Sequence, residues 1–230
     1  MKKVLSFSLF GTNEKYSSGA IENAKRHKTF FTDWEMRVYH NDSVDPKVIE
    51  ELNSLGCVTI NTGEETNYFA TMWRFYPMCE EGVSHVISRD CDSRIFERDE
   101  AAVNDWLQSG KKFHIIRDHP IGHGWVINAG MWGCRNEGDL DMISLINEYK
   151  KNNNRPDERA IDQCFLRDVI HEIARKDCHV SDEYFNHEGI GQKISRPRHL
   201  DDFAFIGEPF DKDNNQIEDY RASIKERYSY

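Results

Sequence analysis

The segment GVSHVISRDCDSRIFERDE, residues 82–100, decides how the fold is interpreted. Val86 and Ile87 belong to an apolar run that predicts a buried strand, and the charged second half follows directly. Asp90 and Asp92 stand two residues apart where this strand ends. Side chains at i and i+2 of an extended segment point to the same side, so the two carboxylates face one point.

Two neighbouring like charges need a cation between them, or one of them must take up a proton. Carboxylate oxygens suit a hard divalent ion such as Mg²⁺ or Mn²⁺, which keeps positions open for phosphate oxygens. Such an ion can bridge a diphosphate and neutralise its charge as it leaves. Arg89 and Arg94 flank the acidic pair and could add to a phosphate-binding field. The alternative reading of Asp90 and Asp92 is a solvated acidic turn.

The composition favours one sizeable α/β domain, or one domain with a tail. The chain has 230 residues, of which 38% are hydrophobic and 12% aromatic, enough for a packed core. Its net charge of −10 argues against a sequence-independent grip on nucleic acid. No apolar run approaches the roughly 18 residues of a membrane span. We therefore expect that the protein does not bind nucleic acid and has no membrane-spanning segment.

Two further features bear on location. The start, MKKVLSFSLFGTNEK, mimics a short signal peptide but lacks a small-residue cleavage site, and we predict that it forms the first buried strand. The six cysteines are scattered and form no C-x-x-C pair. Reduced thiols and a cytoplasmic location are the expectation.

Strand and helix patterns alternate along the chain. Predicted strands cover 2–10, 36–40, 57–60, 85–90, 112–118 and 126–134; predicted helices cover 17–31, 46–56, 68–78, 97–110, 140–150 and 158–176. From about Ser181 the chain becomes polar and irregular. This alternation predicts a mainly parallel sheet covered on both faces, with the ligand at the carboxyl ends of its strands.

Four motifs follow one another along the chain, and their order and spacing are more specific than any one of them: MWRFYPM (72–78), HVISRDCDSRIF (85–96), INAGMWG (127–133) and AIDQCFL (160–166). Together they resemble glycosyltransferases of the GT-A fold, with the pattern of glycosyltransferase family 8 and its small bacterial and viral relatives. The likeness covers about residues 3–170. It implies a Rossmann-like nucleotide-diphospho-sugar transferase fold, with a mainly parallel central sheet flanked by helices.

The resemblance implies an activity and a domain plan. The activity is metal-dependent transfer of a sugar from a UDP- or GDP-sugar to an acceptor hydroxyl, with a glycan as the expected acceptor. Residues 1–180 would form the nucleotide-sugar-binding and catalytic domain. Residues 181–230 would be a C-terminal extension that packs on or over the active site, within one domain overall. A sugar-1-phosphate nucleotidyltransferase and a non-catalytic sugar-binding module stay open as alternatives.

The resemblance also assigns residues by motif. Asp90 and Asp92 would hold Mn²⁺ or Mg²⁺ against the diphosphate. Asp162 would bind donor-sugar hydroxyls, and Gln163 would face the reacting carbon. The remaining donor-binding residues would be Phe10, Gly11, Tyr16, Arg74, Arg89, Asn128, Ala129 and Gly130.

One motif departs from the family pattern. The family carries a histidine metal ligand late in the chain, where AFIGEPFDK places Ala204 instead. His199, five residues earlier, is a candidate substitute for the third protein ligand.

The loop that follows the predicted strand 112–118 is rich in polar groups. HIIRDHPIGHG gathers Asp118, His119 and His123 around two glycines. A second metal site is one interpretation, but the spacing matches no zinc signature, and a loop lining the pocket is favoured. Asp118 or His119 could serve as general base if the enzyme inverts.

Aromatic residues near the proposed pocket have two uses. Trp73, Phe75 and Tyr76 lie in a predicted helix and are expected in the core. Trp125 and Trp132 flank the pocket and are candidates to stack on a sugar.

Overall fold

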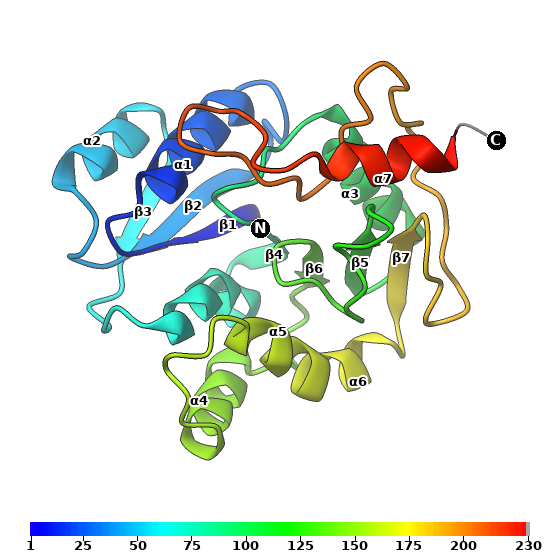
Figure 1. Cartoon of the computed structure of the whole chain (residues 1–230). Coiled ribbons are helices and arrows are strands. Elements are labelled where there is room, and N and C mark those ends of the chain that lie inside the picture. Colours follow the sequence, from blue (N-terminus) through cyan, green and yellow to red (C-terminus); the bar gives the residue numbers. More distant parts are fainter. Residues whose placement is uncertain (229–230) are drawn as a thin grey trace.

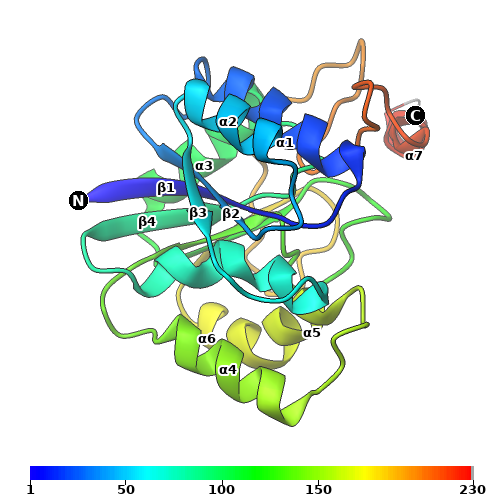
Figure 2. The same cartoon turned by 90° about the vertical axis from the view of Figure 1, so that its left-hand side faces the viewer.

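A computed structural model of the chain describes residues 1–228 and shows three layers (Figures 1 and 2). One seven-stranded sheet forms the middle layer, in the order β3-β2-β1-β4-β6-β5-β7. The strands are β1 (Lys2–Leu9), β2 (Glu35–His40), β3 (Val58–Asn61), β4 (Val83–Ser88), β5 (Phe113–Arg117), β6 (Trp132–Arg135) and β7 (Cys178–Asp182).

Helices cover both faces of this sheet. They are α1 (Glu14–His27), α2 (Pro46–Ser54), the 3₁₀ helix η1 (Tyr68–Cys79), α3 (Glu97–Ser109), α4 (Met142–Asn152), α5 (Ile161–Phe165), the π-helix η2 (Leu166–Ile170), α6 (His171–Ala174) and α7 (Tyr220–Arg227). In Figure 2, α1, α2 and α3 lie above the sheet and α4, α5 and α6 below it. Within residues 1–228, none of these helices has both the length and the apolar character needed to span a bilayer.

The sheet is mainly parallel, as the sequence predicts. β1 pairs in parallel with β2 and β4, β2 with β3, and β5 with β7. The exception is β6, which runs antiparallel between β4 and β5. The carboxyl ends of β1, β4 and β5 therefore meet at one edge, and the segments that leave them can build a common site.

Strand β1 shows how sequence sets the two sides of the sheet. Leu5, Phe7 and Leu9 point into the upper core. Ser8, which points the other way, places its hydroxyl against η1, where it accepts a hydrogen bond from the backbone N–H of Arg74 at 2.9 Å. A polar residue at this one strand position therefore fixes the helix that carries the arginine.

Three local predictions need correction. The predicted strand 126–134 is reduced to β6 (Trp132–Arg135), whereas the predicted helix 68–78 is present as the 3₁₀ helix Tyr68–Cys79. The predicted helix 158–176 begins only at Ile161 and contains a π-helical turn. Strand β7 and helix α7 lie in or beside the part of the sequence that reads as irregular, because CHVSD and YRASIKER carry too many polar residues to give an apolar period.

Candidate active site

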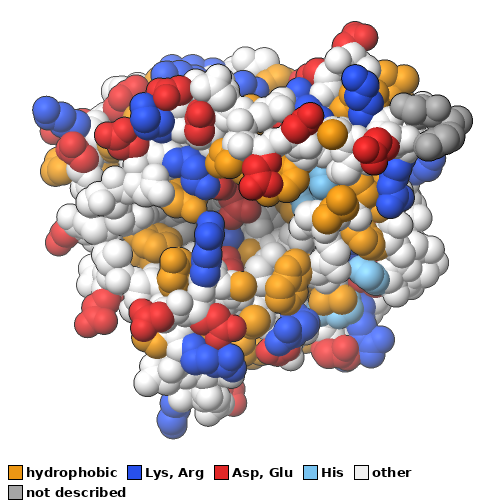
Figure 3. Space-filling model, viewed as in Figure 1, with side chains coloured by type: hydrophobic (Ala, Val, Ile, Leu, Met, Phe, Trp, Pro, Cys, Tyr) orange, Lys and Arg blue, Asp and Glu red, His pale blue; other side chains and the backbone are white. Residues whose placement is uncertain are grey.

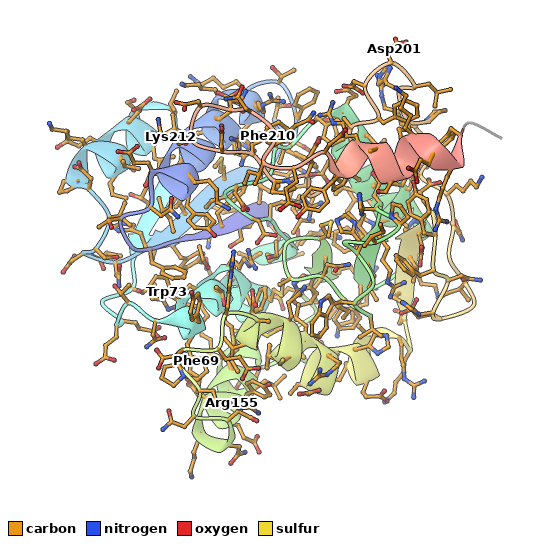
Figure 4. The ribbon with its side chains drawn as sticks, viewed as in Figure 1. Phe69, Trp73, Arg155, Asp201, Phe210 and Lys212 are labelled. Atoms are coloured by element: carbon orange, nitrogen blue, oxygen red, sulfur yellow. The ribbon has the colours of Figure 1, made fainter. Side chains whose placement is uncertain are left out.

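A cleft of about 890 Å³ opens at the carboxyl ends of the strands. Figure 3 shows it as a hollow near the middle of one face, with acidic and basic side chains at its rim. In Figure 4, Trp73 lies low in the view, on η1, and Phe210 lies above it, in the C-terminal segment. Eleven of the predicted site residues line the cleft: Phe10, Gly11, Tyr16, Arg74, Asp90, Asp92, Asn128, Ala129, Gly130, Asp162 and Gln163.

Arg74 is the buried centre of the polar group in the cleft. One guanidinium nitrogen donates to Asp90, and another donates to Asp162 at 2.8 Å. Asp162 is buried, and burial raises the pKa of its carboxyl, an effect that the charge of Arg74 opposes. Arg74 therefore links η1, the end of β4 and the start of α5 into one polar unit.

Asp92 faces the same cleft from the other side of the acidic turn. It accepts a hydrogen bond from Lys15 Nζ, 2.6 Å away, at the start of α1. Burial and the neighbouring charge of Asp90 raise the pKa of Asp92. Burial alone would lower the pKa of Lys15, but its hydrogen bond to Asp92 outweighs that and raises it. Both carboxylates therefore line the same cleft, and the charge of Asp90 acts on Asp92.

The segment Asn128–Gly130 forms the wall opposite Asp90. A Cβ added to Gly130 would lie 1.9 Å from Asp90 Oδ2, so only glycine leaves room for this carboxylate. The backbone N–H of Ala129 donates to Gln163 Oε1 at 2.5 Å. Because its oxygen is used in this way, Gln163 has its –NH₂ group left to offer as a donor.

The donor set fits a hard divalent cation that is shared with a ligand. Arg74 and Lys15 each engage one carboxylate oxygen, Asp90 Oδ1 and Asp92 Oδ2. Mg²⁺ is commonly held by one or two carboxylates together with substrate phosphates, so a closed cage of protein ligands is not required. Within the described part of the chain, no group of three or more His, Cys, Asp and Glu residues could hold a metal.

His199 is not brought to this site. Its side chain is largely exposed, and Nε2 lies 3.3 Å from Glu97 Oε1 at the beginning of α3. It does not line the cleft. The expectation that it replaces the family's histidine ligand is therefore not supported by the geometry.

Arg89 and Asp118 are also placed away from the cleft lining. Arg89 points under α3, where it forms two hydrogen bonds with Asp99, of 2.9 and 2.6 Å. The carboxylate of Asp118 has no exposed surface and is held by Arg98 and Arg198. A fully buried carboxylate between two arginines cannot reach an acceptor hydroxyl, so Asp118 is a structural ion pair and not a base.

His119 lies beside the cleft with both ring nitrogens engaged. Nδ1 accepts from the backbone N–H of Gly122 at 2.8 Å, and Nε2 lies 3.0 Å from the carbonyl oxygen of Tyr220. Burial lowers the pKa of His119. Its ring therefore ties the loop to α7 and is not available as a base.

The two candidate tryptophans, Trp125 and Trp132, differ in how far they are buried. Trp132 is fully buried in β6, where it packs edge-on against Phe75. Trp125 is half-buried in a second, smaller groove of about 320 Å³ that meets the cleft at Gly122. Only Trp125 keeps a surface that a ligand could reach.

Several cleft residues lie outside the four motifs and were not predicted from the sequence. Thr66, Asn67 and Thr71 also line the cleft, and so does Arg159, directly before the motif AIDQCFL (160–166). The C-terminal segment adds Gly207, and the backbone N–H of Phe210 donates to the carbonyl oxygen of Asp92 at 2.8 Å. For Arg159 the signal was present, because it stands three residues before Asp162.

Comparison with known proteins rests on structure. No family model and no curated protein matches the sequence. Among solved structures, S. aureus TarS 1-349 aligns with a TM-score of 0.50 and 14% identity, over 80% of this chain. The mannosyltransferase PcManGT from Pyrobaculum calidifontis aligns with a TM-score of 0.50 and 12% identity, also over 80% of this chain.

The chain spans 59% of the TarS chain and 55% of PcManGT, a little over half of each. At such low identity the likeness shows the fold alone. The protein therefore has the GT-A glycosyltransferase fold that its four motifs predict.

Proposed function

We propose that this protein is a metal-dependent glycosyltransferase, which moves a sugar from a nucleoside diphosphate sugar to an acceptor hydroxyl, with a glycan as the expected acceptor. The observation that carries the proposal is the pair Asp90 and Asp92 at the carboxyl end of β4, facing a cleft of about 890 Å³. PcManGT, which shares the fold, has been solved in complex with GDP-Man and Mn²⁺.

The nucleoside half of the donor would lie over the segment that follows β1. Phe10, Gly11 and Tyr16 line this part of the cleft, and Thr66 and Thr71 line the wall beside it. A hydroxyl- and amide-rich wall can bind a ribose and a base edge, while the aromatic rings offer stacking surfaces.

Asp90 and Asp92 would hold Mn²⁺ or Mg²⁺, which when bound would supply positive charge to the departing diphosphate. The chain's own contribution is to keep both carboxylates in place. Arg74 anchors Asp90 from below, and Lys15 anchors Asp92 from α1. The positive charges of Arg74 and Lys15 would also reduce the repulsion between the two carboxylates when no metal is bound.

The donor sugar would lie against the start of α5. Asp162 would accept hydrogen bonds from sugar hydroxyls there, and the –NH₂ group of Gln163, for which residues 1–228 offer no acceptor, would donate toward the sugar. In the reaction the bond between the anomeric carbon and the diphosphate oxygen breaks, and a bond to the acceptor oxygen forms. The acceptor proton leaves by a route other than Asp118 and His119, since neither carries a free atom toward the cleft.

A panel of nucleotide sugars tests the proposal. The protein is incubated with UDP- and GDP-sugars and Mn²⁺, and release of nucleoside diphosphate is measured for each donor. Transfer or slow hydrolysis of one donor, lost on chelation of the metal, is expected. Release of pyrophosphate from a nucleoside triphosphate with a sugar 1-phosphate would favour a nucleotidyltransferase instead. Thermal stabilisation by free sugar alone would favour a binding module.

We also propose a cytoplasmic location. All six cysteines are free thiols, and no pair of them forms a disulfide among the described residues. Reduced thiols persist in cytoplasm.

A further inference from the structure

His123 is a buried histidine of the cleft, and one of its two ring nitrogens has no hydrogen-bond partner among the described residues. Its side chain lies in the loop after β5 and lines the cleft, with only 5% of its surface exposed. Nδ1 accepts a hydrogen bond from the backbone N–H of Asp118 at 3.0 Å. Among residues 1–228 no group forms a hydrogen bond with Nε2, whereas both nitrogens of His119 are used.

The hydrogen bond from Asp118 fixes the chemistry of the free nitrogen. An imidazole nitrogen that accepts a hydrogen bond carries no proton, so in the neutral ring the proton of His123 is on Nε2. Burial lowers the pKa of His123 to about 3, so the ring is neutral at physiological pH. His123, which lines the cleft, thus carries its N–H donor on Nε2. A protonated ring nitrogen cannot ligate a metal, so His123 does not replace the missing third ligand.

The strand order shows which part of the donor meets this N–H group. The segment after β1 lies on one side of Asp90 and Asp92, which follow β4, and His123 follows β5 on the other side. A nucleoside bound over the β1 side would therefore have its diphosphate at the aspartates, with the outer phosphate nearer His123. The ring of His123 also packs against Phe205, two residues before the cleft residue Gly207.

We propose that His123 Nε2–H donates a hydrogen bond to an anionic oxygen of the outer phosphate of the nucleoside diphosphate. Hydrogen bonds to a charged acceptor are shorter and roughly twice as strong as neutral ones, and a donor aimed at a leaving group acts most where negative charge develops. Arg74 and Lys15 are already paired with carboxylates, so Arg159 is the one arginine among the described cleft residues without an ion-pair partner. A donor with no protein partner is therefore of particular use to a diphosphate. No proton is transferred by His123 in this role.

Two variants separate this role from a structural one. In H123N the shorter side chain can still accept from the Asp118 N–H but no longer reaches the phosphate. In H123Q the longer amide keeps an N–H group near the Nε2 position but loses the contact with Asp118. If His123 contributes to phosphate binding, H123N loses more affinity for the nucleoside diphosphate than H123Q does. If His123 contributes to the structure of its loop, H123Q loses more.

The inference rests on the proposed function, and its test uses the nucleotide that wild-type protein turns over. Affinities for the nucleoside monophosphate and diphosphate are measured by calorimetry with Mn²⁺. H123N is expected to weaken diphosphate binding about tenfold, the effect of one charge-assisted hydrogen bond, and to leave monophosphate binding unchanged. H123Q is expected to lose less, and the pH profile of turnover between pH 6 and 9 to stay the same.

Three outcomes would overturn the inference: diphosphate binding by H123N at wild-type strength, an equal loss of monophosphate and diphosphate binding, or a loss confined to the intact nucleotide sugar. The last would assign the contact to the sugar. A wild-type protein that binds no nucleotide would instead refute the proposed function, so the two failures are distinct.

Discussion

Gly130 and Asp90 are in direct contact across the cleft. The carboxylate of Asp90 occupies the space that a side chain at position 130 would need, with Oδ2 only 1.9 Å from the position of a Cβ. The motifs INAGMWG (127–133) and HVISRDCDSRIF (85–96) therefore meet in one steric arrangement. This explains why the segment after Asn128 must carry glycine where it passes the acidic pair.

The substitution G130A is expected to push the Asp90 carboxylate away from the cleft. Overpacking of this kind costs about 1–3 kcal/mol of stability, which a folded protein of this size can tolerate. Donor turnover should fall at least about tenfold while circular dichroism stays native. The matched control is G124A, where the nearest atom would be 3.8 Å from the new Cβ. Equal activity of both variants would show that the Gly130 contact has no role in catalysis.

Arg159 lines the cleft, and the described residues offer it no ion-pair partner. We expect R159A to raise KM for the nucleotide sugar about tenfold, with a weaker salt dependence, because an unpaired arginine binds phosphate by charge-assisted hydrogen bonds. Arg155 is the control. It forms an ion pair of 2.9 Å with Glu158 and lies away from the cleft, at the edge of the lower layer (Figure 4). Steady-state kinetics at two salt concentrations should leave R155A unchanged; a KM effect of equal size in R155A would point to general surface charge.

Asp118 should behave as a structural residue. D118N removes the charge that Arg98 and Arg198 share in the core, and breaking such a buried pair costs about 3–5 kcal/mol. The expected result is a large drop in Tm, measured by calorimetry. A general base would give the opposite pattern, with Tm unchanged and turnover abolished.

Glu188 is expected to make the stability of the fold decrease at acid pH. It lies between Arg117 and His171; burial would raise the pKa of its carboxyl, but these hydrogen bonds outweigh it and lower the pKa to about 2. A carboxyl with a lowered folded-state pKa stabilises the fold above its ordinary pKa of 4.5, and this stability is lost as the pH falls toward 2. E188Q should be less stable at pH 7 and show a flatter fall in Tm over that interval. E172Q, at an exposed carboxyl that pairs with Arg175, should keep the wild-type slope.

The sequence predicts most of the site because its motifs follow strands. Asp90 follows the buried strand β4 and Asp162 lies at the start of α5, so their place at the edge of the sheet follows from local patterns. The contacts of Asp118 do not follow in this way. Its partner Arg198 lies 80 residues further along the chain, in a segment without periodicity. Local patterns carry no information on such a contact.

The helical segment that begins at Ile161 also shows what local sequence patterns do not determine. Asp162 opens a helix that the sequence extends without interruption, but a π-helical turn follows directly after Phe165. The apolar period of the segment fits both arrangements. Tertiary packing, and not local propensity, decides the turn.

The central claim is that Asp90 and Asp92 join a divalent cation to the diphosphate of the donor. Calorimetric titration of the nucleoside diphosphate, with and without Mn²⁺, tests it most directly in wild-type protein and in D92N. We expect Mn²⁺ to tighten binding at least about tenfold in wild-type protein, or about 1.4 kcal/mol, and to have no effect in D92N. The same gain from Mn²⁺ in both proteins would contradict the account.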